Sequence, residues 1–355
     1  MKYILTEKSL DKDLKNEDAG SKAILDINKI AKEIGYKELN VYRLNKNRSF
    51  WNKLKNQLVS FYSWLRIIRV INKDDILLMQ TPIRERMFGR NICQHYLYRH
   101  GVRIISILHD VESLRNMWEL TLYDSQEFNV TINNSTYLIV HNKSMHKKLK
   151  ELNIPSNKMI DLEIFDYLYN KQIFKKNDNS NAIVVAGNCS IKKSPYIYKL
   201  GNLKSNFNIY GPNFNKDKSK EINNINYKGS FDANVIPEKL DGKYGLVWDG
   251  NKLDECAGNT GKYLQYNNPH KASLYLVSGL PLIVWKKSAI AKFVKENNVG
   301  VSVDSLYELD DVLKNISNDD YRKMKENVNL VSAKIRNGFY MKRALSIAEK
   351  SRNEN

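Results

Sequence analysis

Residues 103–110 read RIISILHD, a short apolar run that ends in a histidine and a carboxylate. A run of this length, rich in isoleucine and bounded by polar residues, is typical of a strand buried within a parallel sheet. Four similar runs lie in the first half of the chain, separated by helical patterns, at residues 2–6, 39–44, 76–80 and 137–141. This alternation of strands and helices predicts a parallel α/β sheet.

The second half of the chain repeats the alternation without repeating the sequence. Strand-like runs lie at residues 182–186, 207–210, 244–248, 282–285 and 299–303. A polar stretch at 170–181 separates the two series, and we interpret it as a linker. We therefore predict two Rossmann-like, doubly wound domains, residues 1–169 and 182–337, which face a central cleft at the carboxyl ends of their strands.

Composition narrows the class of protein. The 355 residues carry 57 lysines and arginines against 39 acidic residues, a formal charge of +18, and 42% of them are hydrophobic. That fraction excludes a disordered chain, and no apolar run approaches the roughly 20 residues of a membrane span. Cys93, Cys189 and Cys256 have neither disulfide-framework nor zinc-binding spacing, and no signal-peptide segment follows Met1. We expect a cytoplasmic protein.

Positive charge is concentrated around residues 45–72, since Lys46 to Lys73 include seven basic residues and no acidic one. Apolar residues recur there at intervals of three and four, which predicts a helix with Trp51 and Trp64 on its apolar face. Basic side chains at the margins of such a face suit an anionic membrane surface, here the inner face of the cell membrane. The alternative is a helix that packs on the core while its basic side chains extend to solvent.

Several motifs are absent. There is no zinc-finger spacing, no aromatic-glycine RNA-binding signature and no basic tail, so we expect no nucleic-acid partner. The G-x-G-x-x-G and P-loop patterns do not occur. The D-x-D sequence Asp11-Lys12-Asp13 lies in a charged loop rather than after an apolar strand, so we expect neither a metal nor another cofactor.

Two groups of candidate residues lie in the first half. Gly20, Ser21 and Lys22 follow the first strand and open a helix, where a glycine and a helix N-terminus favour a phosphate or sugar oxygen. The alternative is a simple N-cap with a turn glycine. His109 and Asp110 end the fourth strand, where a carboxylate can take a proton from an attacking hydroxyl. The alternative for Asp110 is an N-cap of the next helix.

The second half of the chain also contains candidate residues, and several of them are lysines. Gly187 and Asn188 end its first strand, and Lys192 and Lys193 follow, a combination that suits a diphosphate. A second strand ends near Asp249, and after a long polar loop a helix is predicted to begin at Pro269. That start is expected to place three polar side chains toward the cleft, where dipole and charge favour diphosphate, namely His270, Lys271 and Ser273.

These residues together resemble a bacterial glycosyltransferase family of GT-B fold. The family includes O-antigen and capsule galactofuranosyltransferases, to which the likeness is stronger, and the UDP-glucose-dependent glucosyltransferases of serine-rich adhesins. The likeness spans nearly the whole chain and rests on residues 18–23, 109–110, 164–168, 186–188, 229–233 and most of 245–276.

The resemblance implies transfer from a UDP-sugar, with Tyr227 stacking on uracil and Lys271 holding the diphosphate. It places the Gly20 to Lys22 loop near donor and acceptor, and a C-terminal helix at 338–355 against the first domain. In the glucosyltransferase branch an arginine follows the Gly-Asn turn and contacts UDP. Lysines stand in that neighbourhood here, and they lack the bidentate geometry of arginine.

We expect sugar transfer to a hydroxyl of a bacterial surface glycan, with galactofuranose as the preferred donor sugar. Retaining GT-B enzymes usually carry E-x7-E in the second domain, and the spacing occurs here only at Glu119 and Glu127, in the first. We therefore expect inversion, with Asp110 as the base and His109 as the second choice, and Lys271 in place of a metal. The acceptor is expected to be lipid-diphosphate-linked.

Alternative interpretations of the function stay open. One alternative is an enzyme that uses UDP-glucose or another hexopyranose and acts on a glycoprotein or capsule glycan. Furanose and pyranose donors differ in the placement of their hydroxyl groups, which only the local geometry of the pocket distinguishes. A non-catalytic basic protein that binds polyanions is the alternative from another class. A homo-oligomer is a further open possibility.

Overall fold

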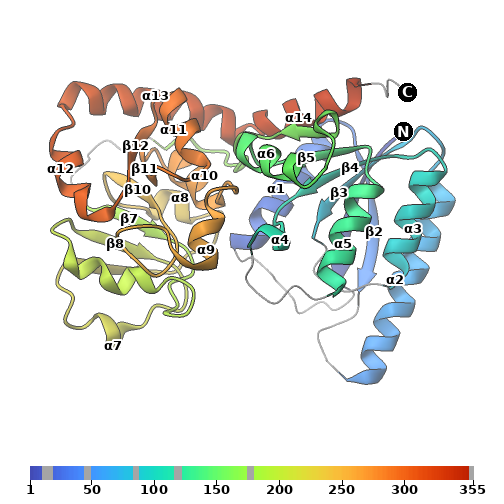
Figure 1. Ribbon diagram of the computed structural model, residues 1–355, viewed down its shortest axis with the longest axis horizontal. Helices are drawn as coiled ribbons and strands as arrows, with labels where there is room; N and C mark the ends of the chain where they lie inside the picture. The colour runs from blue at the N-terminus through green and yellow to red at the C-terminus, as the bar shows by residue number, and fades with distance from the viewer. Residues whose placement is uncertain (10–18, 44–48, 83–87, 116–121, 174–179, 352–355) are drawn as a thin grey trace.

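The computed structural model describes residues 1–9, 19–43, 49–82, 88–115, 122–173 and 180–351, which form two α/β domains side by side (Figure 1). Each domain contains a sheet of six parallel strands with helices packed around it. The prediction of two doubly wound domains is therefore confirmed.

The first sheet has the order β2-β1-β3-β4-β5-β6. Its strands are β1 (Lys2–Ser9), β2 (Lys37–Arg43), β3 (Ile76–Thr81), β4 (Arg103–Leu108), β5 (Tyr137–Val140) and β6 (Met159–Asp161). The helices of this domain are α1 (Ala19–Glu33), α2 (Phe50–Val70), α3 (Phe88–Arg99), α4 (Glu112–Arg115), α5 (Leu122–Asn133) and α6 (Lys143–Glu151). The stretch with which the sequence analysis began forms β4, and all its apolar side chains are buried.

The second sheet has the order β12-β11-β10-β7-β8-β9. Its strands are β7 (Ile183–Ala186), β8 (Phe207–Tyr210), β9 (Ile225–Gly229), β10 (Tyr244–Val247), β11 (Leu282–Trp285) and β12 (Gly300–Val303). The helices of this half are α7 (Lys216–Ser219), α8 (Ile236–Lys239), α9 (Gly258–Tyr263), α10 (His270–Val277), α11 (Ile290–Asn297), α12 (Leu309–Lys314) and α13 (Asn318–Arg336). The chain ends in α14 (Phe339–Lys350).

Two strands were not predicted from the sequence, β6 and β9. Both lie at an edge of their sheet, where one side of the strand has no neighbour to pair with. β6 has three residues, and β9 alternates exposed with half-buried side chains. Neither therefore contains a continuous apolar run like those that mark most of the other ten strands.

Strand order determines where a ligand can bind. In the second sheet the order reverses between β7 and β10, which are neighbours although two strands separate them in sequence. Loops that leave the carboxyl ends of these two strands diverge, and open α/β sheets bind ligands at such a point. Gly187 follows β7 and Asp249 follows β10, so both lie there.

The C-terminal helix returns to the first domain. After α13, Gly338 turns the chain with a φ of 71°, and a Cβ there would lie 2.7 Å from Ile30 of α1. Helix α14 then packs on the first domain, as Figure 1 shows. Glu349 near its end pairs with Lys2 at 3.1 Å and accepts a hydrogen bond from Tyr36 at 2.9 Å.

The structure of helix α2 differs from the expectation that Trp51 and Trp64 lie on one apolar face. Trp64 is buried, only 1% exposed, and packs with core residues of β1, β3 and α3, whereas Trp51 is 69% exposed. Thirteen positions separate them, which at 3.6 residues per turn turns them about 140° apart on the helix. The two tryptophans therefore do not share one apolar face.

Candidate active site

Asp110 lies just beyond the end of β4, at the edge that faces the second domain. Its side chain is 40% exposed and pairs with Arg115 at 3.3 Å. Enclosure by protein raises the pKa of the carboxyl above its ordinary value; Arg115 opposes the rise and Glu112 adds to it. Lys193 of the second domain also lowers this pKa, so the domains approach each other here. A carboxylate with a raised pKa at this edge is suited to accept a proton.

A hydrogen bond to Gln80 and stacking on Phe165 fix the ring of His109, the second candidate base. Its Nε2 lies 2.7 Å from Oε1 of Gln80, whose amide nitrogen donates to Asn28 at 2.8 Å and to the Ile24 carbonyl at 3.2 Å. Those two bonds assign the glutamine oxygen to the histidine, so Nε2 carries the proton and donates it. The ring stacks on Phe165, with centroids 5.6 Å apart. Nε2 is thus a donor and Nδ1 carries no proton, so His109 stays the second candidate base beside Asp110.

The turn that carries Asp110 is held by a side chain that the sequence analysis did not single out. The backbone N–H of Val111 donates to the hydroxyl oxygen of Tyr263 at 2.9 Å, and this contact is buried. Tyr263 belongs to α9 of the second domain and packs against Leu108 and Val111. In the sequence it is one aromatic residue in a polar loop, and nothing in its spacing indicates a partner more than 150 positions away.

A pocket opens beside Asp110 in the first domain. Apolar side chains of β4 and α5, Leu108 and Phe128, form part of its wall, and Thr81, Glu112 and Thr131 contribute polar atoms. The Asp110 carboxyl lines this pocket as well.

The opposite edge belongs to the second domain. Gly187 follows β7 with a φ of 144°, which favours glycine, and a Cβ added there would meet no atom within 4 Å. The backbone turn therefore faces open space. Asn188 accepts a hydrogen bond from the Ser190 N–H at 3.0 Å, and the exposed Lys192 and Lys193 follow in the same turn. We call the space between this edge and Asp110 the cleft.

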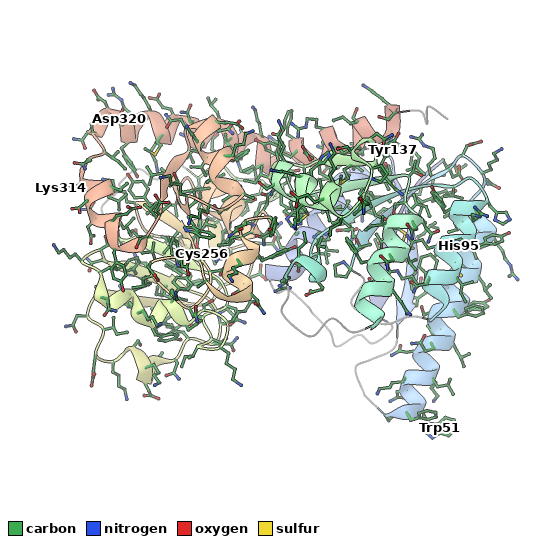
Figure 2. All side chains as sticks on the ribbon, in the orientation of Figure 1. Trp51, His95, Tyr137, Cys256, Lys314 and Asp320 are labelled. Carbon is green, nitrogen blue, oxygen red and sulfur yellow. The ribbon has the colours of Figure 1, made fainter. Side chains whose placement is uncertain are left out.

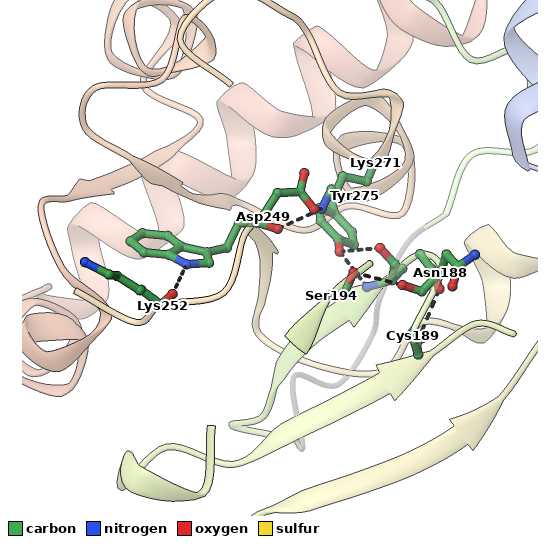
Figure 3. Close-up of polar contacts among 10 residues, drawn as sticks. Asn188, Cys189, Ser194, Asp249, Lys252, Lys271 and Tyr275 are labelled. Atoms are coloured by element: carbon green, nitrogen blue, oxygen red, sulfur yellow. Dashed lines mark hydrogen bonds and ion pairs between the residues drawn. The ribbon is translucent and has the colours of Figure 1, made fainter. Parts of the chain in front are cut away.

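Lys271 extends toward the ends of β7 and β10, as Figure 3 shows. Its Nζ donates to the Asp249 carboxylate and to the Trp248 carbonyl, each at 2.9 Å. Both side chains of the ion pair remain partly exposed, Lys271 by 18% and Asp249 by 24%. An anion that entered the cleft would therefore meet a lysine already oriented by a carboxylate, and would compete with that carboxylate for it.

Close packing fixes the two strands that support Lys271. The Tyr275 hydroxyl oxygen accepts a hydrogen bond from the Ala186 N–H at 2.7 Å, which ties α10 to the end of β7. The Tyr275 ring lies directly over Gly245, where a Cβ would approach it to 2.2 Å. Gly245 is thus required for the position of α10, and the geometry of Lys271 depends on it.

Tyr227 lies on the edge strand β9 and is part of an aromatic stack. Its ring is parallel to that of Phe214 within 7°, with centroids 4.4 Å apart, and Phe214 stacks in turn on Tyr198. Its hydroxyl donates to the Gly211 carbonyl at 2.9 Å. One face of Tyr227 is therefore covered by Phe214, and uracil stacking on this residue stays a prediction.

Three predicted contact residues do not face the cleft; they hold residues 164–168, a segment between the domains that we call the strap. Ser273 is fully buried and donates to the Phe165 carbonyl at 2.6 Å. His270 contacts the Asp166 carbonyl at 3.3 Å, and burial lowers its pKa to about 4 and keeps it neutral. Lys22, also buried, pairs with Asp26 at 2.5 Å and donates to the Leu168 carbonyl at 3.0 Å.

The expected orientation of His270 and Ser273 toward the cleft is therefore wrong, and Lys22, which was expected to meet a phosphate or sugar oxygen, is buried against Asp26 and the strap instead. Their polar atoms are needed for the carbonyl groups of the strap, which are buried between two domains and require partners. Gly20 and Ser21 lie in the first turn of α1 rather than in a loop. The side-chain surroundings of those two residues lie outside the described residues, as do Asp11, Asp13, Lys46 and Glu119.

Asn268 closes the contact between domains and was also missed. Its side-chain nitrogen donates to the carbonyls of His141 and Glu163, at 2.6 and 2.9 Å, and its oxygen accepts from Asn142 at 2.7 Å. Its backbone N–H donates to Nδ1 of His141 at 2.9 Å. Burial lowers the pKa of His141 to about 4, so the ring is neutral and can accept this bond. We call the contacts of Asn268 and of the strap the seam.

Two features are absent from the described part of the chain. No group of three histidine, cysteine or carboxylate side chains there could hold a metal ion. None of the described helices is both long and apolar enough to span a membrane. Independence from metal stays a prediction.

Comparison with known proteins agrees with this architecture. The chain matches the Glucosyltransferase 3-like N-terminal domain over residues 2–164 and the Glucosyltransferase 3-like C-terminal domain over residues 183–348. The Beta-1,6-galactofuranosyltransferase WbbI of Escherichia coli (strain K12) is 31% identical over 94% of this chain and 96% of WbbI. Glucosyltransferase 3 of Streptococcus gordonii is 25% identical over 90% of this chain and 91% of that protein.

Among solved structures, HepE of Anabaena in complex with UDP has a similar fold. The TM-score is 0.65 at 10% identity, and the match covers 98% of this chain and 99% of HepE. At that identity the likeness concerns the fold alone. The family matches cover both domains and nearly the whole chain, so the resemblance noted from the sequence is confirmed: the protein belongs to the Glucosyltransferase 3-like family of glycosyltransferases.

Proposed function

We propose that this protein transfers galactofuranose from UDP-galactofuranose to a hydroxyl of a bacterial surface glycan, with inversion at the anomeric carbon and without a metal ion. The observation that carries the proposal is the opposition of two kinds of group across the cleft. A carboxylate with a raised pKa, Asp110, lies on one edge, and Lys193 and Lys271 lie on the other. The relationship to WbbI supports galactofuranose as the sugar.

Each side of the cleft has one task in this reaction. The acceptor oxygen forms a bond to the anomeric carbon while the bond from that carbon to the diphosphate oxygen breaks. Asp110 takes the proton that the acceptor hydroxyl loses. The departing UDP keeps the electron pair, and Lys271 stabilises the resulting negative charge with help from the Gly187 turn and its lysines.

Asp249 has a role that changes during the reaction. It holds Lys271 while the cleft is empty of diphosphate, and it gives up that contact in part when the diphosphate binds. Its carboxylate then lies near the sugar that is attached to the diphosphate. We therefore propose Asp249 and the loop that follows it as the place where the donor sugar is selected.

A second donor deserves a direct test. The domain matches are to Glucosyltransferase 3-like proteins, and a relative at 25% identity carries that name, which favours UDP-glucose. A non-catalytic polyanion-binding protein has no support from a family of transferases. We propose a lipid-diphosphate-linked glycan as the acceptor and the cytoplasmic side of the cell membrane as the place of reaction.

The experiment that tests the proposal is calorimetric titration of UDP in the presence of EDTA, with the wild type, Lys271→Ala and Lys286→Ala. Lys286 is an exposed lysine of the same domain whose partner is Asp304, so it controls for loss of charge. Binding by the wild type and by Lys286→Ala, together with weak binding by Lys271→Ala, is expected. No binding of UDP by the folded wild type would contradict the proposal.

The sugar and the stereochemistry need a second measurement. Product formation is compared for UDP-galactofuranose, UDP-galactopyranose and UDP-glucose, and the anomeric configuration of the product is read by NMR. Preferred use of the furanose with inversion is expected. A retained configuration would contradict the assignment of Asp110 as a base in a single displacement.

A further inference from the structure

Helix α2 extends beyond the first domain, and its N-terminal end projects into solvent with Trp51 near the tip (Figures 1 and 2). Its buried side chains are Ser60, Ser63, Trp64 and Ile67, all in the second half of the helix. The first ten residues thus bury no side chain against the described part of the domain. Yet this projecting half is rich in large apolar residues.

Five of the eight exposed large apolar side chains of α2 form a stripe, and Phe50, Phe61 and Val70 lie outside it. The five are Trp51 (69% exposed), Leu54 (43%), Leu58 (62%), Tyr62 (69%) and Leu65 (37%), at intervals of three and four. At about 100° per residue, these positions fall on the side of the helix opposite the buried residues. Helix α2 therefore has two apolar faces, and the fold accounts for only one of them.

The charge beside this stripe indicates what covers it. Lys55, Arg66 and Arg69 are exposed within about 80° of the centre of the stripe, whereas Lys53 lies on the opposite side of the helix. No acidic residue occurs between positions 46 and 73. A second copy of the chain would bring an equally basic face against this one, and the two would repel each other. An anionic bilayer is complementary in both respects, because its headgroups attract the lysines and arginines while its interface accepts tryptophan and leucine.

We propose that the stripe of Trp51, Leu54, Leu58, Tyr62 and Leu65, with the flanking basic residues of α2, binds the surface of an anionic phospholipid bilayer. Trp64 is excluded from the surface because it belongs to the core of the first domain. The contact is peripheral, and it does not depend on the proposed reaction, since lipid binding is measured without donor or acceptor.

Cosedimentation with vesicles tests the proposal. The vesicles contain phosphatidylcholine with or without phosphatidylglycerol, at low and at high salt. The variant Trp51→Glu/Leu58→Glu alters two exposed positions of the stripe, and Leu330→Glu alters an exposed leucine (66%) of α13 in the second domain as a matched control. UDP titration of each variant provides a readout of folding that is separate from the lipid surface.

Wild type and Leu330→Glu are expected to bind the phosphatidylglycerol vesicles, more weakly at high salt, and the stripe variant at least about tenfold more weakly than either. All three proteins are expected to bind UDP alike. Equal vesicle binding by wild type and stripe variant would overturn the proposal. So would a stripe variant that differs from wild type only by dissociating a dimer in analytical ultracentrifugation, which would identify the stripe as a contact between copies. Failure of UDP binding in every protein would contradict the proposed function and leave the vesicle result standing.

Discussion

Lys271 and Ser273 lie two positions apart on α10, and the structure gives them opposite surroundings. Lys271 reaches the cleft and pairs there with Asp249, while Ser273 is buried and holds the Phe165 carbonyl of the strap. Side chains two positions apart on an α-helix point about 200° apart, so Lys271 and Ser273 cannot face the same space. The same helix thus serves the cleft with one side and the seam with the other.

The difference teaches that a polar residue at a strand end or helix start has two possible partners in a two-domain protein, a ligand or the other domain. Side chains of the cleft, such as Asp110 and Lys271, are partly exposed. Side chains of the seam, such as Ser273 and Asn268, are buried with complete sets of partners. Substitutions in the cleft should therefore change binding or rate, and substitutions in the seam should change stability.

The largest effect is expected from Asp110→Asn. Loss of the proton acceptor should lower kcat by about 10²- to 10⁴-fold and leave the affinity for UDP unchanged. The raised pKa of Asp110 means that activity is lost as the pH falls through a value above the ordinary 3.8 of an aspartate. The variant should lack this acidic limb of the pH profile of kcat/KM. A variant with wild-type kcat would remove Asp110 from the mechanism.

Lys271→Ala should follow, with a Kd for UDP about 10- to 100-fold above that of the wild type, because a charge-assisted contact to phosphate is lost. Its melting temperature should change little, since Lys271 is partly exposed and its pair with Asp249 is not buried. Calorimetry and thermal unfolding measure the two quantities. A large loss of stability with unchanged UDP affinity would assign Lys271 to the seam and break the comparison.

Asn268→Leu is the corresponding test of the seam. It removes three side-chain hydrogen bonds at a buried site and leaves their partners unsatisfied, so the free energy of unfolding should fall by about 2 kcal/mol or more. UDP affinity, measured well below the melting temperature, should stay within about twofold of the wild type. Asn223→Leu, at an exposed asparagine of the second domain, is the control. Unchanged stability of Asn268→Leu would show that the seam does not hold the domains.

Tyr263→Phe should give the smallest effect. It lies between the substitutions in the cleft and those in the seam. The Val111 N–H would lose its acceptor, which costs about 1 kcal/mol, and the Asp110 turn would be held less firmly. We expect kcat to fall by less than about tenfold, KM to stay constant, and the acidic limb of the pH profile to shift. A fall in stability without any change in the pH profile would make Tyr263 a member of the seam alone.

The sequence was sufficient for ten of the twelve strands, including the partly exposed edge strands β2 and β12, because each contains a short run rich in apolar residues. β6 and β9 were missed because β6 has only three residues and β9 alternates exposed with half-buried side chains. The positions of Asp110 and Lys271 near the carboxyl-end edges of the two sheets were also expected from the sequence, since polar residues that follow a buried strand or begin a helix often lie there; their roles stay predictions.

Only the tertiary structure decided which face of a helix is buried and which residues join the two domains. Composition and periodicity showed that residues 50–70 are helical and amphipathic, but only the packed domain separated buried Trp64 from exposed Trp51. Tyr263 and Asn268 lie in the segment that carries the family resemblance, but nothing in their local spacing indicated their roles, because their partners lie more than 100 positions away in the other domain. Local sequence determines which elements form and where their ends lie, since apolar periodicity and turn residues act over a few positions. Whether a side chain at such an end meets a ligand, the other domain or solvent is decided by long-range packing, which no local pattern contains.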